Sequence, residues 1–436
     1  MHIPSPPPSE LETSRTRGRW LRALSDGLAW PLRGMLERML RHLQVGALSI
    51  TLPSGATLEA QGAQPGPRGL LTLHRWRPVW RLLTSGDIGL ARSYRDGDWS
   101  TPDLTALLEV GIRNEAAWGS ALHASAPMRW LHRAAHGLRR NTRKGSRDNI
   151  SFHYDLGNDF YAEWLDASML YSSGIHSSSA QSLEEAQAAK LQRILDQLAL
   201  QEDSHILEIG CGWGALAERM ALAAPRGYVT ALTLSAEQLR HAAARVRSAG
   251  VGRRVDLRLQ DYRDETGHYD RIVSIEMLEA VGEAYWPEYF ETIKARLRTG
   301  GVAVVQTITI AQDHFARYRA EPDFIQRFIF PGGMLPTREI VQAQAERAGL
   351  QLVQSETFGE SYALTLAEWR HRFLRAWPRI EALGFDEAFR RLWVYYLCYC
   401  EAGFRTSRVD VGLYTMTHAS SDGDTHTYAP KPAGAS

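Results

Sequence analysis

A glycine-rich stretch in the middle of the chain has the composition of a ligand-binding turn. Residues 206–209 are mostly apolar and typical of a strand, and glycines follow at alternate positions, Gly210, Gly212 and Gly214. A helical pattern begins at Ala215. Glycine lets the backbone turn sharply and approach a ligand closely, and the start of a helix offers unpaired N–H groups. The stretch predicts a nucleotide cradle, although a plain strand-to-helix connection has the same pattern.

Two nucleotide cofactors are compatible with this turn. The spacing Gly210-x-Gly212-x-x-Ala215 formally matches the dinucleotide fingerprint, which would bind NAD. That fingerprint also requires an acidic residue near the end of the second strand, where it binds a ribose. The expected second strand, residues 228–234, has no acid at its end. NAD is therefore the less favoured cofactor.

S-adenosylmethionine (SAM) fits the sequence better. SAM is a cation without phosphates, so a carboxylate near the glycine turn would attract its charged end. Glu208 lies in the first strand, just before that turn. Asp261 and Tyr262 follow the expected third strand, where they are placed to contact the adenine. We therefore predict a SAM site formed by the turn and these three residues.

The elements that must position this turn alternate between strands and helices. We expect strands at 206–210, 228–234, 255–259, 271–276, 302–308, 350–357 and 409–416, and helices at 183–198, 215–223, 236–248, 286–298 and 337–348. This alternation predicts an α/β fold with a doubly wound, mostly parallel sheet. Ligands bind such sheets at the carboxyl ends of the strands. Two aromatic, helical insertions, 313–336 and 364–404, could roof an apolar pocket there.

Composition narrows the class of protein. A chain of 436 residues predicts two or three domains at roughly 150 residues each. The balance of 50 basic and 49 acidic residues argues against a general nucleic-acid binder. Three cysteines, Cys211, Cys398 and Cys400, form neither a disulfide framework nor a metal-binding pattern, so we expect a cytoplasmic protein without a metal. No apolar run reaches the ~20 residues that span a bilayer, and the N-terminus lacks a signal-peptide pattern. Any membrane contact would be peripheral.

We expect four parts along the chain: a disordered segment 1–18, a helical and small α+β lipid-docking domain 19–140, a catalytic domain 141–418 and a disordered tail 419–436. An amphipathic helix is expected at 19–43, interrupted at Pro31, with arginines on its polar face. A second basic segment lies near 139–147. Both are compatible with simple solvent-exposed faces and with contact to anionic lipid. The aromatic stretch 149–171 predicts a lid or an N-terminal cap.

Ordered motifs along most of the chain resemble the cyclopropane-fatty-acyl-phospholipid synthases and their mycolic-acid relatives. The motifs are LARSYRDGDW (90–99), HYDLGNDFY (153–161), MLYSSG (169–174), ILEIGCGWG (206–214), VTALTLSAEQ (229–238), EMLEAVG (276–282), FIFPGGMLP (328–336), FGESYALTL (358–366) and YYLCYCEAGFR (395–405). The resemblance extends from about Leu48 to His418. So many motifs in the same order make coincidence an unsatisfactory explanation.

The resemblance implies a SAM-dependent methyltransferase fold in a protein that is bound peripherally at the inner face of the membrane. A homodimer is compatible with it. The resemblance also implies that a methylene group is added across a cis double bond of an unsaturated phospholipid acyl chain. An alkene is a weak nucleophile, so it must be held in line with the sulfonium methyl group. Methyl transfer leaves a carbocation, from which the family is thought to remove a proton with a bound bicarbonate. A dry apolar tunnel would protect that cation from water.

The resemblance also assigns cofactor contacts residue by residue. The positions that match SAM contacts of the family are Tyr171, Gly210, Thr233, Gln238 and Tyr262. Gln238 would bind the ribose, for which the second strand offers no acid. These assignments agree with the site expected from the glycine turn.

For the bicarbonate site, the resemblance implies one acceptor and several donors. Glu279 would accept a hydrogen bond from the bicarbonate O–H, while Tyr362, Gln306 and the backbone N–H of Ile308 would donate to its other oxygens. Ser173 stands where a cysteine is usual, and that cysteine is thought to act through its backbone.

Some positions depart from the best-known family members or have a disputed role. Gln306 and Ala280 replace histidines, and glutamine can donate a hydrogen bond but cannot carry a proton. Some plant synthases resemble this chain at both positions. Cys400 matches a cysteine long discussed as catalytic, but alkene methylation needs no thiolate, so we favour a buried structural residue.

Other functions remain compatible with these residues. The cation could be shifted and reduced to a methyl branch, or the acceptor could be a small amine, as in related plant N-methyltransferases. A non-catalytic lipid-binding protein with a decayed site is a further alternative. The retained Glu279, Tyr362 and glycine turn argue against decay.

Overall fold

The computed structural model describes residues 30–121 and 156–419. The chain forms two compact units, one made of Met1–Trp130 with Asp386–Ala402 and the other of Leu131–Phe385 with Gly403–Ser436. The sequence analysis expected one boundary, at residue 140, and did not predict that the segment Asp386–Ala402 belongs to the first unit. The expected basic linker near 139–147 and the two terminal segments lie outside the described residues.

The first unit contains a small sheet with three helices from its own part of the chain. The strands are β1 (Val45–Thr51), β2 (Thr57–Gln61), β3 (Gln64–Leu73) and β4 (Trp99–Ser100), and the helices are α2 (Trp30–Arg41), α3 (Arg77–Arg95) and α4 (Leu104–Ala121). The sheet order is β2-β1-β3-β4, with β1 parallel to β3. Pro31 lies in the first turn of α2, where a missing N–H costs nothing.

Most of α17 (Glu387–Arg405) belongs to this unit through specific contacts. The Arg391 guanidinium donates to the carbonyl of Trp99 at 2.9 Å, and its carbon lies 4.3 Å from the centre of the Tyr94 ring. Thr105 Oγ1 donates to Glu401 Oε2 at 3.0 Å in a buried environment. These buried polar contacts explain why residues 386–402 group with residues far away in the sequence.

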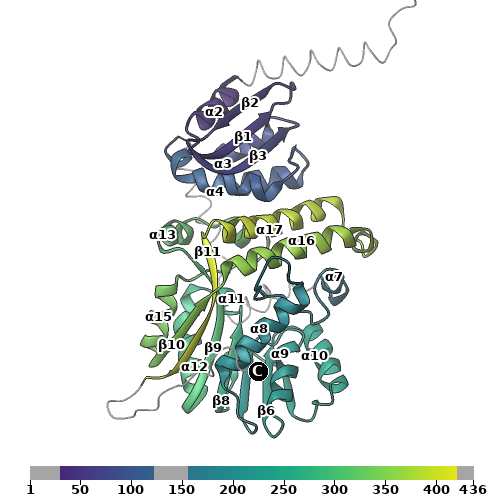
Figure 1. Ribbon diagram of the computed structural model, residues 1–436, viewed down its shortest axis with the longest axis vertical. Coiled ribbons are helices and arrows are strands. Elements are labelled where there is room, and N and C mark those ends of the chain that lie inside the picture. Colours follow the sequence, from purple (N-terminus) through teal and green to yellow (C-terminus); the bar gives the residue numbers. More distant parts are fainter. Residues whose placement is uncertain (1–29, 122–155, 420–436) are drawn as a thin grey trace, which may run out of the picture. The chain divides into compact units, whose positions relative to one another are not determined.

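The second unit is built on a seven-stranded sheet of order β10-β11-β9-β8-β5-β6-β7. Its strands are β5 (His205–Ile209), β6 (Tyr228–Thr233), β7 (Val255–Leu259), β8 (Tyr269–Ile275), β9 (Leu297–Ile310), β10 (Leu350–Thr357) and β11 (Val409–His418). β5 pairs in parallel with β6 and β8, whereas β11 runs antiparallel to β9 and β10. The predicted doubly wound, mostly parallel sheet is therefore confirmed (Figure 1).

Helices cover both faces of this sheet (Figure 1). They are α7 (Asn158–Ala162), α8 (Leu183–Leu198), α9 (Ala215–Ala223), α10 (Ala236–Ser248), α11 (Leu278–Val281), α12 (Trp286–Arg296), α13 (Gln312–Ala320), α14 (Phe324–Phe328), α15 (Arg338–Arg347) and α16 (Gly359–Ala382). Neighbouring strand residues point to opposite faces. Ile206 accordingly joins a core with α8 and α9, while Leu207 joins a second core with α12 and α15. The strand periodicity thus fixes two cores around one buried sheet.

The expected insertions form helices of different lengths. Residues 313–336 contain α13 and α14, whereas 364–404 fall into two long helices, α16 and α17. In the described parts of the chain, no helix combines the length and the apolar character needed to cross a membrane.

Candidate active site

The glycine turn joins β5 to α9 as the sequence predicts. All three glycines have positive φ angles, +84° at Gly210, +50° at Gly212 and +85° at Gly214. A Cβ at Gly214 would lie 2.8 Å from Cβ of Ala242, so close packing of two helices excludes any side chain there. A Cβ at Gly212 would meet no atom within 4 Å. Gly212 therefore borders open space, which is available to a ligand.

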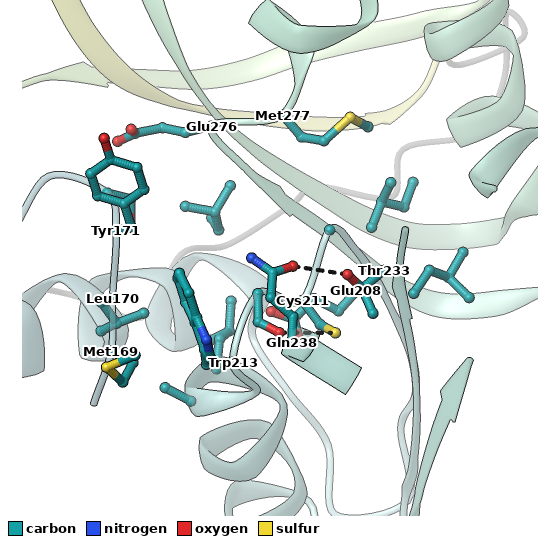
Figure 2. Close-up of a pocket in the computed structure, with 18 of the residues that line it drawn as sticks. Met169, Leu170, Tyr171, Glu208, Cys211, Trp213, Thr233, Gln238, Glu276 and Met277 are labelled. Carbon is teal, nitrogen blue, oxygen red and sulfur yellow. Dashed lines mark hydrogen bonds between the residues drawn. The ribbon is translucent and has the colours of Figure 1, made fainter. Parts of the chain in front are cut away.

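A pocket opens beside this turn at the carboxyl ends of the strands (Figure 2). The residues that line it and that the sequence predicts as cofactor contacts are Tyr171, Glu208, Gly210, Gly212, Thr233, Gln238 and Tyr262. The Thr233 hydroxyl and the Gln238 Oε1 atom are 2.9 Å apart in a hydrogen bond. Figure 2 shows the amide nitrogen of Gln238 turned away from Thr233. This arrangement leaves an amide donor for a polar ligand.

Two predicted cofactor residues have other partners. Gly214 packs against α10, and Asp261 binds its neighbour Arg263, which donates to both carboxylate oxygens at 2.9 and 2.6 Å. Gln260, one position before Asp261, lines the pocket instead. The Asp261 carboxylate forms a buried ion pair with Arg263 in this structure, and its contact with adenine stays a prediction.

The environment of Glu208 indicates whether the pocket can bind SAM. Its side chain is buried, and its Oε2 atom has no hydrogen-bond partner among the described residues. Burial raises the pKa of Glu208 to about 8, against the opposing charge of Lys190. A buried carboxylate of this kind favours a nearby cationic ligand, because the positive charge of the ligand would offset the hydration that the carboxylate loses on burial. The open space at Gly212 and the unsatisfied Glu208 both fit a cationic nucleoside such as SAM.

Lys190 is a buried cation that the sequence analysis missed. It lies on α8 with no exposed surface, and its Nζ atom donates to Ser172 Oγ at 2.6 Å. Burial lowers the pKa of Lys190 to about 8, while the charges of Glu276 and Glu208 act in the opposite direction. Helical periodicity could have revealed this burial from the sequence, since Lys190 falls four positions before Ile194 on the apolar stripe of the predicted helix.

Glu276 is the centre of the polar cluster in this pocket. It follows the last residue of β8, and its carboxylate accepts three hydrogen bonds: Oε1 from the Ser173 N–H at 2.9 Å and from Gln306 Nε2 at 2.7 Å, and Oε2 from the Tyr362 hydroxyl at 2.6 Å. Burial raises the pKa of Glu276, whereas these hydrogen bonds and the charge of Lys190 favour the ionised form. The residue is half-buried, and its carboxylate is held by three hydrogen bonds.

The structure brings together three of the residues predicted for an anion site, but around a protein carboxylate. Tyr362, Gln306 and Ser173 meet at Glu276, a residue that the sequence analysis did not single out. The local sequence indicates only that Glu276 is an acidic residue at the end of an expected strand, three positions before Glu279. Bicarbonate itself stays a prediction.

Glu279 has a separate environment. It lies on α11, and its Oε1 atom accepts a hydrogen bond from the Ile308 N–H. Burial raises the pKa of Glu279 to about 8, and the neighbouring charge of Glu276 adds to that effect. The predicted donor Ile308 is thus bound to the predicted acceptor Glu279.

Cys400 and Ala280 complete the predicted set. Cys400 is half-buried on the part of α17 that belongs to the first unit, whereas Glu276 and Glu279 belong to the second. Its role stays a prediction. Ala280 lines the pocket, so its small side chain leaves room where the resemblance expects a histidine.

This sheet order and a glycine turn that borders a cofactor pocket define the class of SAM-dependent methyltransferases. Residues 141–413 match the family model described as mycolic acid cyclopropane synthetase, and the chain belongs to this family. It is 39% identical over 394 residues to tuberculostearic acid methyltransferase UfaA1 of Mycobacterium tuberculosis, which covers 88% of this chain and 90% of the relative.

Two further comparisons agree. The cyclopropane-fatty-acyl-phospholipid synthase of Escherichia coli strain K12 is 35% identical over 339 residues, covering 76% of this chain and 83% of the relative. The crystal structure of mycolic acid cyclopropane synthase CmaA1 complexed with SAH and CTAB aligns with a TM-score of 0.58 and 30% identity, covering 62% of this chain and 97% of that chain. The recognised resemblance and the SAM-dependent class are therefore confirmed.

Proposed function

We propose that the protein transfers a methyl group from SAM to a cis double bond of an unsaturated phospholipid acyl chain and closes a cyclopropane ring. The observation that carries this proposal is the position of Glu276, a half-buried carboxylate that lines the same pocket as the glycine turn. Alkylation of an alkene creates a carbocation, and a fixed negative charge in a dry site stabilises it. Family membership supports the same chemistry.

The residues of the pocket have distinct tasks in this proposal. When bound, SAM supplies an electrophilic methyl group. Glu208 would attract its cationic end, Gln238 and Thr233 would bind the ribose, and Gly212 would let the backbone approach it. The apolar side chains of Met169 and Leu170, which line the pocket, would exclude water from the reacting carbons.

A second candidate differs only in the product. The relative with 39% identity is named a tuberculostearic acid methyltransferase, which favours C-methylation of an acyl chain without ring closure. The relative with 35% identity is named a cyclopropane-fatty-acyl-phospholipid synthase. A methyl branch also requires a reductant, because the cation must gain a hydride. The cyclopropane product needs no such partner, and we therefore prefer it.

We further propose that the protein works in the cytoplasm, bound peripherally to the inner face of the membrane. In the first unit, α2 buries Leu36, Met39 and Leu40 but exposes its arginines, and Trp30 at its start is 72% exposed. An exposed tryptophan beside a basic helix face suits a surface of anionic phospholipids.

Lipid mass spectrometry tests the proposed function. Purified protein would be incubated with SAM and vesicles of an unsaturated phosphatidylglycerol, and the acyl chains analysed before and after ozonolysis. Cyclopropanation adds one CH₂ and abolishes cleavage by ozone at the former double bond. A methyl branch adds one CH₂ and two further hydrogens. Unchanged acyl chains with turnover of a small amine would favour the amine alternative instead.

A further inference from the structure

We propose that Glu276 is the proton acceptor of the reaction, so that the chain itself supplies the base for which its relatives are expected to recruit a bicarbonate. This inference rests on the proposed function and assigns Glu276 a chemical step in it. It starts from one juxtaposition: the Ser173 N–H, the Gln306 amide and the Tyr362 hydroxyl all donate to one carboxylate, that of Glu276.

The donor set leaves no equivalent place for a second anion. The Ser173 N–H and the Tyr362 O–H each have one hydrogen, and both hydrogens point to Glu276. A bicarbonate held by the same donors would have to displace that carboxylate. Elsewhere in the cluster it would still lie close to the Glu276 carboxylate, and like charges at short range repel each other.

The backbone at Glu276 is held in an unusual conformation. Its φ angle is +49°, a left-handed value that residues other than glycine rarely adopt. Such a conformation is unfavourable and persists where the surrounding structure enforces it, often at functional sites. The Glu276 N–H donates to the Gln306 carbonyl at 2.8 Å, and this bond fixes the residue at the end of β8. The backbone therefore aims the side chain at the pocket.

The electrostatic surroundings suit a base. Burial raises the pKa of Glu276, whereas Lys190 and the three hydrogen bonds act in the opposite direction. A carboxylate with a raised pKa binds a proton more tightly than an exposed one, which suits a general base. Glu276 also lines the pocket, as do Met277 and Tyr171 (Figure 2), whereas Gln306 and Tyr362 are not among the lining residues.

The step balances without another reactant. After methyl transfer, the substrate is a carbocation with the new methyl group on the neighbouring carbon. One C–H bond of that methyl group breaks, and its electron pair forms the third C–C bond of the ring. The proton goes to a Glu276 oxygen, so the carboxylate becomes a neutral carboxylic acid. Loss of that proton to solvent after product release restores the base.

The test compares wild-type protein, Glu276→Gly and Glu276→Gln in buffers depleted of bicarbonate and buffers supplemented with it. Glycine favours a positive φ angle, so Glu276→Gly keeps the backbone and removes the carboxylate. We expect wild-type turnover to be independent of bicarbonate, and both variants to lose on the order of 100-fold or more in depleted buffer. Bicarbonate should restore Glu276→Gly, where Ser173, Gln306 and Tyr362 become available, but not Glu276→Gln, where an amide fills the space.

A matched control and a binding measurement complete the design. Glu202→Gln removes an exposed carboxylate that pairs with Arg226, and it should behave as wild type. Carbon-13 bicarbonate, followed by NMR line broadening, should bind to Glu276→Gly and not to the wild type. SAM affinity, measured by calorimetry, should be near normal in all variants and shows that each is folded.

Bicarbonate-dependent wild-type turnover, or saturable binding of carbon-13 bicarbonate to the wild type that Tyr362→Phe abolishes, would overturn the assignment. Normal turnover of Glu276→Gln would do the same. The binding measurement needs no lipid substrate, so it decides the role of the site even if the proposed acyl-chain reaction is wrong.

Discussion

The Tyr362 hydroxyl donates to Glu276 Oε2 at 2.6 Å, although 86 positions separate the two residues in the sequence. This bond joins the first turn of α16 to the carboxyl end of β8. It favours the ionised form of Glu276 and so lowers the pKa that burial raises. Through this contact, α16 influences the pKa of Glu276 in the pocket.

Tyr362→Phe should move the acid side of the pH profile. Without the hydroxyl, the pKa of Glu276 rises, so Glu276 needs a higher pH to be ionised and to act as a base. We expect the acid limb of kcat/KM to shift upward and turnover at neutral pH to fall by on the order of 10-fold or more. Tyr228→Phe, an exposed tyrosine on β6, is the matched control. An unshifted acid limb in Tyr362→Phe would contradict the role of this bond.

Gly212→Val should weaken SAM binding without unfolding the protein. The new side chain would enter the open space beside the turn, where the cofactor is proposed to lie. Gly250→Val is the control, because Gly250 also has a positive φ angle and open surroundings but follows α10. Calorimetry should show at least about a 10-fold loss of affinity, or about 1.4 kcal/mol, for the first variant only. Equal affinities would remove the cofactor assignment.

Glu279→Gln should change the pH dependence of stability. The pKa of Glu279 is raised from 4.5 to about 8 in the folded state, mainly by burial. Between these two values the folded state holds a proton that the unfolded state has lost, so the contribution of Glu279 to stability falls as pH rises. Glutamine does not titrate.

Urea unfolding at several pH values measures this effect. The free energy of unfolding of Glu279→Gln, relative to wild type, should increase from about pH 4.5 to about pH 8 and level off above that range. Glu202→Gln, at an exposed ion pair, should show no such trend. A constant difference across the range would mean that Glu279 is not protonated in the folded protein.

Binding to vesicles should depend on α2 and on salt. Replacing Arg33, Arg38 and Arg41 with glutamine should weaken binding to anionic vesicles, since each basic side chain near such a surface contributes about 1 kcal/mol. Added salt should weaken wild-type binding in the same way. Sedimentation with phosphatidylglycerol and phosphatidylcholine vesicles measures both effects.

The control for this prediction removes the same charge from the second unit. Arg226, Arg240 and Arg319 have side chains exposed by 60% or more, and their replacement by glutamine should leave vesicle binding nearly unchanged. Equal losses in both triple variants would indicate a general charge effect instead of docking by α2.

The elements that local sequence determines were predictable. The helix at 183–198 agrees with the structure because Ser182 and Glu185 form a capping box at its start and Ala199 adopts a left-handed conformation at its end. The glycine turn was predictable because positive φ angles select glycine. Both signs lie within a few residues of the feature they determine.

The centre of the site could not be predicted in the same way. Glu276 gains its meaning from Ser173 and Tyr362, which lie 103 and 86 positions away in the sequence. No local pattern reveals which distant donors will converge on a carboxylate. The resemblance placed Ser173, Gln306 and Tyr362 in one site, and the structure brings these three together at Glu276. It directed attention to Glu279, however, whose Oε1 atom is bound to Ile308.

The most direct test of the central claim uses SAM that carries a CD₃ group in place of the transferred methyl. Purified wild-type protein would act on unsaturated phosphatidylglycerol vesicles in bicarbonate-depleted buffer, and mass spectrometry would count the deuterium atoms in the product. The account predicts a cyclopropane chain that gains CD₂, because one deuteron leaves the transferred methyl group for Glu276. Acyl chains that remain unmodified in this buffer, or a product that keeps all three deuterium atoms, would contradict it.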